Sequence, residues 1–383
     1  MSNKILDLGL VPFYWRTKSS IDQAPQDIPT VLPFSFTFNE KLQLIIQKRN
    51  PEVLDALERV YTENANVGYL QEGHALAQSY GGEFIEFFER ATSSLSTPPK
   101  SVADIGCGGV YLLQELKKRG LSVKGIDPSP VTVEAGRRAG IEIVPDFYPS
   151  DSLTQRFDVL IHYDVLEHVE DPVAFLRSHH SNMLSTGGII FAVPDCTEHI
   201  ALGDISMMLH EHLNYYDEES LTNVVRAAGF EPRMLQAAKH GGVLLCFATP
   251  QEVNNDSKNI ENSGCEKFDR FHENAKTSMQ RFMRLANSCG DGTLGLYVPL
   301  RAFPYLGAFN NTFHLRFFDD DPGLHGRLYD GFDVSVENFS DLVGNPPPNL
   351  MICSLAFGDR IAEKLTRESL PFIKVTRWRE LFD

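Results

Sequence analysis

Two acidic residues stand where a carboxylate could bind a ligand that carries a sugar or a positive charge. Asp104 opens the segment Asp-Ile-Gly-Cys-Gly-Gly-Val, and Asp127 follows the next apolar run, 23 residues later. A glycine turn after a parallel strand lets backbone approach a ligand closely and directs helix N–H groups toward it. The spacing suits a carboxylate that binds both ribose hydroxyls of an adenosine. The pattern predicts an adenosine-type site that includes Gly106 and Gly108.

The acid before the glycines separates two kinds of adenosine ligand. Dinucleotide sites use G-x-G-x-x-G directly after the strand, but here Asp104 precedes Gly106 and no glycine lies three residues beyond Gly108. A carboxylate repels a pyrophosphate and attracts the sulfonium and ammonium groups of S-adenosylmethionine. We therefore expect S-adenosylmethionine as cofactor, contacted by Asp104, Gly106, Gly108, Asp127 and Pro128. The alternative is that Asp104 and Asp127 only cap helices.

The elements that must position these residues alternate from residue 100 onward. Strand-like runs and helical runs follow one another, which predicts a doubly wound, Rossmann-like α/β sheet. We expect Asp146, after the third strand, at the adenine amino group, and His162 and Tyr163, at the end of the fourth, near the methionine part. Two more strand-like runs, 230–235 and 243–248, are close enough to form an antiparallel hairpin at the sheet edge. The expected strands are 101–104, 122–127, 141–144, 157–162 and 187–193.

The chain divides into four parts on its composition. Residues 1–95 are expected to form a mostly helical N-terminal region, and residues 96–250 the core with the glycine turn. Residues 251–290 are polar before a helical run, which indicates a linker and a bridging helix. A second strand–helix pattern predicts a smaller C-terminal α/β domain over residues 291–383.

A His-Glu-His segment follows the fifth expected strand. The loop that carries His210, Glu211 and His212 leaves the carboxyl edge of the sheet, the edge that holds the cofactor. The histidines could supply a base near neutral pH, and the glutamate could orient it. Histidines two apart on a helix face different directions, so this pair alone does not predict a metal site. The alternative is that they cap the next helix.

The core resembles the class I S-adenosylmethionine-dependent methyltransferases. VADIGCGG and VKGIDPSP look like their first two motifs, with Val110 where a third glycine is usual. FDVLIHYDVLEHVEDP and LSTGGIIFAVP look like their fourth and fifth strand regions. The ordered set covers residues 100–250, and it implies that the chain is a methyltransferase.

A longer stretch resembles the C-methyltransferases that act on deoxysugar nucleotides, which have a second, C-terminal α/β domain. The resemblance rests on MLHEHLNYYDEESLTNVVRAAGF, KHGGVLLCFATP, FFDDDPGLHGRLYDGFDV and NPPPNLMICSLAFGDRIAEKL. It implies that His212 takes a proton beside a ketone, with Glu211 next to it, and that the resulting enolate is methylated. The matching family segment folds over the acceptor pocket, so Tyr61 and Tyr69 could line that pocket; the alternative is that they only pack in a helical stretch. Tyr215, just after the His-Glu-His segment, is also expected to bind the substrate. The chain departs from this family in having no cysteine before Cys107 and Leu209 where the family has tyrosine.

Composition limits the other function classes. A net charge of −16 disfavours nucleic-acid binding, and no apolar stretch is long enough to cross a membrane. The six cysteines form no C-x-x-C pair, so we expect no metal and reduced thiols in a cytoplasmic protein. The resemblance to the C-methyltransferases implies a small-molecule acceptor, such as a sugar nucleotide. Three alternatives stay open: an O- or N-methyltransferase, a nucleotide-dependent oxidoreductase or epimerase, and a binding module without activity.

Overall fold

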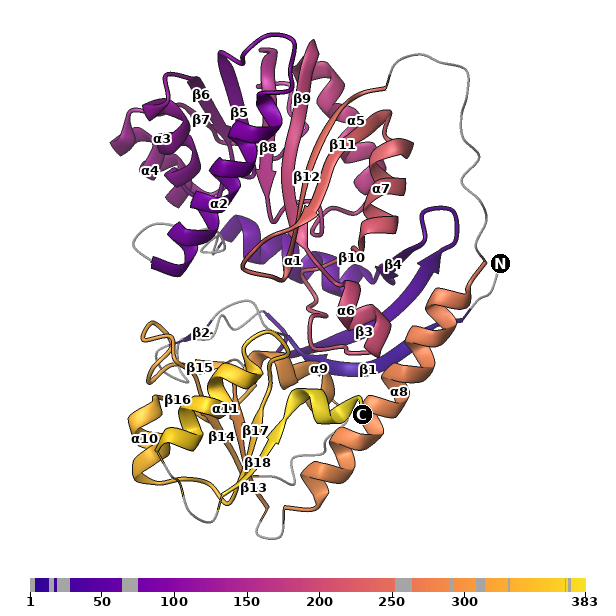
Figure 1. Ribbon diagram of the computed structural model, residues 1–383, viewed down its shortest axis with the longest axis vertical. Coiled ribbons are helices and arrows are strands. Elements are labelled where there is room, and N and C mark those ends of the chain that lie inside the picture. Colours follow the sequence, from indigo (N-terminus) through magenta and orange to yellow (C-terminus); the bar gives the residue numbers. More distant parts are fainter. Residues whose placement is uncertain are drawn as a thin grey trace.

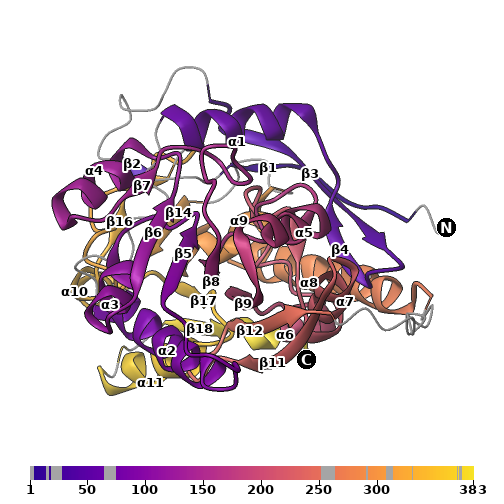
Figure 2. The same ribbon diagram turned by 90° about the horizontal axis from the view of Figure 1, so that it is seen from above.

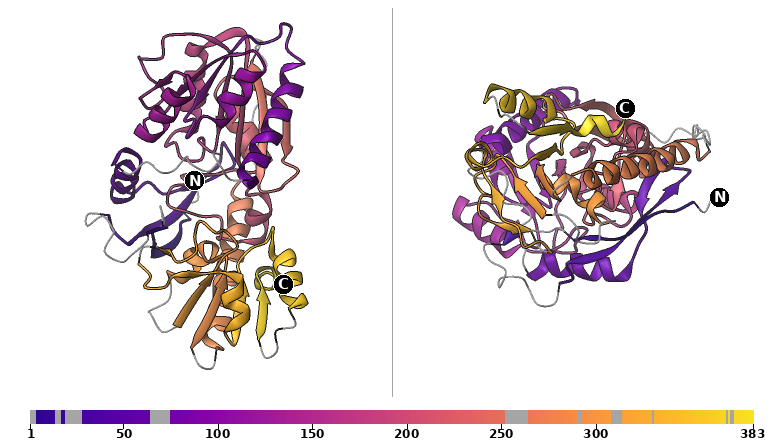
Figure 3. Two further views of the ribbon diagram at one scale, coloured as in Figure 1. Left: turned by 90° about the vertical axis from the view of Figure 1, so that its left-hand side faces the viewer. Right: turned by 90° about the horizontal axis from the view of Figure 1, so that it is seen from below.

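Two α/β units stacked end to end make up most of the molecule, with an N-terminal antiparallel sheet beside their junction (Figure 1). The left view of Figure 3 shows the two units one above the other. Chain order runs from the N-terminal strands through the larger unit to the smaller one. The computed structural model describes residues 4–13, 17–18, 28–63, 75–251, 264–289, 292–307, 314–329, 331–368, 370 and 373–383.

The larger unit is built on a seven-stranded mixed sheet. Its strand order is β11-β12-β9-β8-β5-β6-β7, and the five strands from β9 to β7 run parallel to one another. β12 runs antiparallel to both β9 and β11, which confirms the expected edge hairpin. The strands are β5 (Ser101–Ile105), β6 (Ser122–Ile126), β7 (Ile143–Val144), β8 (Phe157–Tyr163), β9 (Met183–Pro194), β11 (Phe230–Ala237) and β12 (Val243–Pro250).

Helices cover both faces of this sheet (Figure 2). Apolar side chains of α2 and α3 pack on one face, and those of α5 and α7 pack on the other. Parallel strands need such crossover helices, which explains the near-continuous burial of β8 and β9. The helices of this unit are α2 (Ala75–Thr92), α3 (Tyr111–Lys118), α4 (Pro130–Ala139), α5 (Pro172–Asn182), α6 (Thr197–Leu202) and α7 (Glu218–Ala227).

The described residues before residue 48, which are 4–13, 17–18 and 28–47, form strands and differ from the expected helical region. In β3 the buried side chains of Leu32, Phe34 and Phe36 alternate with more exposed ones, which is the period of a strand. Prolines at 12, 29 and 33 also prevent a continuous helix there. Helix begins only at α1 (Pro51–Glu63). The antiparallel sheet joins β1 (Leu6–Pro12), β3 (Val31–Asn39), β4 (Leu44–Gln47) and, from the larger unit, β10 (Asn214–Tyr215).

The C-terminal unit is a second α/β layer built on five parallel strands in the order β16-β14-β13-β17-β18. The long helix α8 (Glu266–Asn287) runs beside both units in Figure 1. A separate two-stranded ladder pairs β2 (Thr17–Lys18) with β15 (Leu328–Tyr329). The other elements are β13 (Thr293–Tyr297), α9 (Phe303–Leu306), β14 (His314–Phe318), β16 (Val336–Glu337), α10 (Phe339–Gly344), β17 (Asn349–Ile352), α11 (Gly358–Arg367) and β18 (Lys374–Arg377), with 3₁₀ turns at Pro299–Ala302 and Trp378–Leu381.

A buried carboxylate joins the two units. Asp204, which is fully buried, accepts hydrogen bonds from the Tyr305 hydroxyl at 2.9 Å and from Trp378 Nε1 at 3.1 Å. Ser206 donates its backbone N–H and its hydroxyl to the same carboxylate. Because every one of these donors is buried, loss of the acceptor would leave them unsatisfied.

We therefore expect Asp204→Ala to destabilise the protein by about 3 kcal/mol, since it leaves buried donors of Tyr305 and Trp378 without a partner. The measurement is the thermal unfolding midpoint, compared with Asp151→Ala at an exposed surface position. Equal midpoints for the two variants would contradict a role for Asp204 in holding the units together.

Candidate functional site

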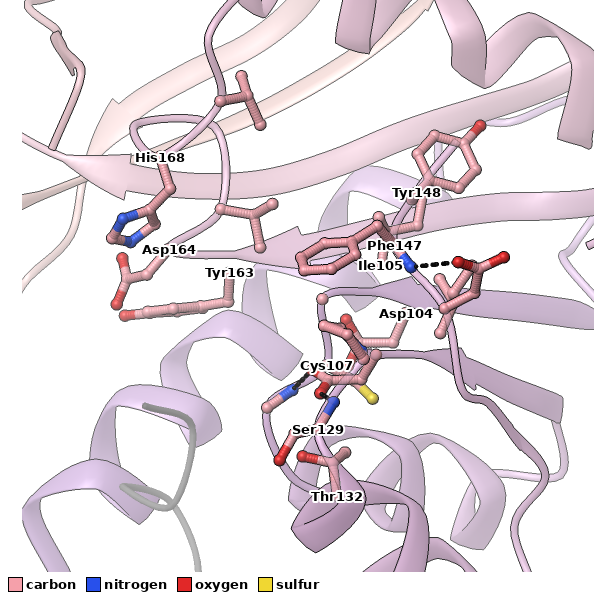
Figure 4. A pocket seen from close by; sticks show the side chains of 18 of the residues that line it. Asp104, Ile105, Cys107, Ser129, Thr132, Phe147, Tyr148, Tyr163, Asp164 and His168 are labelled. Carbon is pink, nitrogen blue, oxygen red and sulfur yellow. Dashed lines mark hydrogen bonds between the residues drawn. The ribbon is translucent and has the colours of Figure 1, made fainter. Parts of the chain in front are cut away.

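A cavity of about 540 Å³ opens at the carboxyl edge of the seven-stranded sheet. It receives the ends of β5, β6 and β8 and the loops that follow them (Figure 4). Parallel α/β sheets bind ligands at this edge because helix N-termini and short loops converge there. Its lining includes Asp104, Gly106, Cys107, Gly108, Asp127, Pro128, Ser129, Thr132, Asp146, Phe147, Tyr148, Tyr163, Asp164, Val165 and His168.

The glycine turn and Asp127 form one hydrogen-bonded unit. The Asp127 carboxylate accepts from the backbone N–H of Gly108 and from that of Ser129, each at 2.8 Å. Gly106 and Gly108 have φ values of 63° and 56°, which favour glycine. A Cβ on Gly106 would lie 2.8 Å from the Val165 side chain. The turn is thus closely packed and brings backbone, without side chains, to the cavity wall.

The two carboxyl groups of this wall sit in an environment that disfavours their negative charge. Burial raises the pKa of Asp104 well above its usual value, and the neighbouring Asp127 raises it further. Burial also raises the pKa of Asp127, against the hydrogen bonds from Gly108 and Ser129. A cation placed here would offset both effects, because it favours the charged carboxylates. The donor set therefore fits the cationic S-adenosylmethionine.

Of the other residues expected at the cofactor, three line the cavity and one does not. Pro128, Asp146 and Tyr163 line the cavity, and Asp146 accepts from the Phe147 N–H at 2.9 Å. His162 does not reach the cavity. Since successive side chains of β8 point to opposite faces, His162 lies in the core, stacked on Phe191 with ring centroids 4.6 Å apart.

Backbone hydrogen bonds bring the His-Glu-His segment to the loop after β8. The Glu167 carbonyl accepts from the N–H groups of Leu213 and Asn214, at 2.7 and 3.1 Å. The ring of His168 donates from Nδ1 to the carbonyl of Glu211 at 2.8 Å. Two segments more than forty residues apart are therefore fixed side by side.

This pairing gathers Glu167, His168 and His212 into one cluster. One nitrogen or carboxylate oxygen from each residue lies within 4.8 Å of those of the other two. The rings of His168 and His212 have centroids 5.1 Å apart. Glu167 is 1% exposed, and neither of its carboxylate oxygens has a hydrogen-bond partner among the described residues. His168 also lines the cavity, so the cluster adjoins the cofactor site.

Burial sets the ionisation of the cluster and its neighbours. It raises the pKa of Asp164 and that of Glu211 to about 7, and Asp164 adds to the effect on Glu211. It also raises the pKa of Glu167, which Asp164 raises further. Burial lowers the pKa of His168 to about 4 and that of His212 well below its usual value, where His168 and Arg301 add to the effect. Near neutral pH both histidines are uncharged and can accept a proton or bind a cation.

Four remaining expected residues lie away from the cavity or outside the described residues. His210 is buried against Phe34, and its Nε2 donates to the Leu32 carbonyl at 3.2 Å. Tyr215 is buried in β10, where its hydroxyl donates to Leu209. The side chain of Tyr61, and Tyr69 as a whole, lie outside the described residues.

The structure adds residues that the sequence analysis did not single out. Asp164, with a φ of 53° in the left-handed region, lies beside Tyr163 and His168 in Figure 4. Asp164, Glu167 and His168 all stand in the quoted stretch after the fourth strand. Their acidic and imidazole side chains just beyond a strand end were the signal that could have indicated them.

Comparison with known families finds similarity to methyltransferases over the part of the chain that forms this edge. Residues 77–235 match a family model described as a methyltransferase domain. This stretch, less than half of the chain, is therefore similar to a methyltransferase domain. The match begins in α2 and ends in β11, so this methyltransferase domain includes the cavity, the glycine turn and the His-Glu-His segment.

Curated relatives share this domain at low identity. A protein from Ruegeria pomeroyi named ubiquinone biosynthesis O-methyltransferase is 27% identical over 34% of this chain and 59% of its own length. One from Methylobacterium nodulans with the same name is 35% identical, but only over 24% of this chain and 39% of its own length. A third, from Ralstonia nicotianae, is 26% identical over 50% of this chain and 92% of its own length. The first two relatives are thus covered over less than two thirds of their length.

Among solved structures, a Burkholderia thailandensis 1,6-didemethyltoxoflavin N1-methyltransferase with bound S-adenosylhomocysteine is similar over 55% of this chain and 96% of its own, at 17% identity and a TM-score of 0.40. In the described part of this chain, no helix has the length and apolar character of a membrane span. The six cysteines, all within the described residues, form no disulfide bond.

We expect Asp127→Asn to weaken the binding of S-adenosylhomocysteine about 10- to 100-fold, because a charge-assisted hydrogen bond contributes about 1.5–3 kcal/mol. Isothermal titration calorimetry with the purified full chain measures this. Asp151→Asn, at an exposed position, is the matched control. Unchanged affinity in the Asp127 variant would remove this residue from the site.

Proposed function

We propose that this chain transfers the methyl group of S-adenosylmethionine to a small-molecule acceptor whose proton is withdrawn at the cluster of Glu167, His168 and His212. The observation that carries the proposal is the shared sheet edge, where the cavity of Asp104 and Asp127 adjoins this cluster through His168. When bound, S-adenosylmethionine supplies an electrophilic methyl carbon. Asp104, Gly106, Gly108 and Asp127 are the residues proposed to hold it.

The contribution of the chain's own residues is to make the acceptor nucleophilic. An acceptor C–H or O–H that loses its proton at the cluster keeps the electron pair with which the new bond is formed. An uncharged imidazole is suited to take such a proton, and His168 presents Nε2 for this because its Nδ1 hydrogen is committed to the Glu211 carbonyl. For His212 and Glu211 we propose the roles expected from the sequence: His212 takes a proton from the acceptor, and Glu211 orients it.

Two kinds of acceptor have support. The C-terminal α/β unit matches the organisation of the sugar C-methyltransferases, which favours a keto-sugar nucleotide methylated on carbon beside the ketone. The name of the curated relatives, ubiquinone biosynthesis O-methyltransferase, favours methylation on an oxygen of the acceptor. We propose carbon methylation first, because the Ralstonia relative is covered almost completely by half of this chain and leaves the C-terminal unit without a counterpart.

For His212→Ala we expect a fall in kcat of about 100-fold or more, with unchanged affinity for S-adenosylhomocysteine, because proton transfer by a positioned residue contributes about 10²–10⁴-fold. Initial rates with keto-sugar nucleotides and calorimetry separate the two effects. His314→Ala, at an exposed position in β14, should leave both unchanged. A rate near that of wild type in the His212 variant would refute the role of this residue.

Carbon and oxygen methylation differ in whether the acceptor enolises. If carbon is methylated, the enzyme with S-adenosylhomocysteine should exchange the hydrogen beside the acceptor ketone for deuterium from solvent, seen by mass spectrometry. Heat-inactivated protein is the control. Methylated product without any such exchange would point to an oxygen or nitrogen acceptor.

A further inference from the structure

The cluster of Glu167, His168 and His212 combines the donor groups of a transition-metal site. Two imidazole nitrogens and one carboxylate oxygen lie within 4.8 Å of one another and come from two separate segments. Zinc sites with three protein ligands use such sets and keep one position open. The His-Glu-His spacing alone gave no sign of this, because the partners of His212 come from the loop after β8 and not from His210.

The hydrogen bonds around the cluster orient it as metal ligands are oriented. A metal-binding histidine commonly donates its other ring N–H to a backbone carbonyl, which fixes the tautomer and aims the remaining lone pair. His168 does this with Nδ1 to Glu211, and its Nε2 then lies 3.7 Å from the carboxylate of Glu167.

Glu167 provides an independent observation. Its side chain is 1% exposed, and both carboxylate oxygens lack a hydrogen-bond partner among the described residues. Buried polar groups in folded proteins are satisfied by a donor, a water or an ion, and an unsatisfied one is costly. Asp164 and Glu211 lie close enough to act electrostatically on this region, and the positive charge of Arg301 acts on His212.

We propose that Glu167, His168 and His212 bind one divalent transition-metal ion of the Zn²⁺ type, with an open position for an oxygen of the acceptor. This rests on the proposed function and specifies how the cluster acts. With the ion bound, the ring nitrogens of His168 and His212 are ligands and no longer take the proton themselves. The ion would hold the acceptor oxygen beside the cofactor cavity and acidify its O–H, or the C–H beside its carbonyl, and the released proton would pass to solvent water. His212 is then a ligand, and it acts on the acceptor through the ion.

Metal binding by the full chain, after treatment with a chelator and dialysis, tests the proposal. Calorimetric titration with Zn²⁺ should show one equivalent bound by wild type and by the surface variant His314→Gln. The affinity should fall about tenfold or more in each of Glu167→Gln, His168→Gln and His212→Gln. No binding by wild type, or equal binding by folded cluster variants, would overturn the site. Circular dichroism identifies any variant that fails to fold.

A measurement on wild type alone keeps the test independent of folding defects. X-ray absorption at the zinc edge, with one equivalent of Zn²⁺, should show two imidazole ligands together with oxygen ligands and no sulfur. Any other ligand set would overturn the assignment. Titration of the same samples with S-adenosylhomocysteine separates the two proposals, since loss of metal binding with cofactor binding and methyl transfer intact rejects only the metal site.

Discussion

The carbonyl of Glu167 is the point on which the candidate site depends. By accepting from the N–H groups of Leu213 and Asn214, it locks the loop after β8 to the segment after β9. The same segment continues into β10, which pairs with β4 of the N-terminal sheet. Backbone hydrogen bonds of this kind must be satisfied when buried, so the position of His212 beside His168 is set by the main chain.

Electrostatics divides the carboxyl edge of the sheet into two neighbouring regions that both favour a cation. In the first, Asp104 and Asp127 raise the energy of each other's charge in a cavity that fits a sulfonium ligand. The second region contains the carboxyl groups of Asp164, Glu167 and Glu211 together with the uncharged imidazoles of His168 and His212. A donor with a positive charge and a group that removes a proton from the acceptor are the two requirements of methyl transfer to a weak nucleophile.

The parts outside the methyltransferase domain support this edge from two sides. In the N-terminal sheet, β4 pairs with β10, and Phe34 packs against the buried ring of His210. His210 therefore contributes to the packing of this sheet. The C-terminal unit is held to the larger unit through Asp204. The carboxylate of Asp204 accepts hydrogen bonds from the Tyr305 hydroxyl and from Trp378 Nε1. The N-terminal sheet and the C-terminal unit therefore both contact the methyltransferase domain near the His-Glu-His segment.

The sequence by itself determined the α/β alternation, the glycine turn with its two acids, the edge hairpin and the second α/β unit, because these follow from local periodicity and from fixed spacing along the chain. It did not determine the strands of the first 47 residues, where proline and short apolar runs hid an alternating pattern. Only the tertiary structure decided that His162 points into the core and that His212 meets Glu167 and His168. The physical reason is that side-chain direction at a strand end and contacts between distant segments depend on sheet register and long-range backbone pairing, which no local pattern encodes.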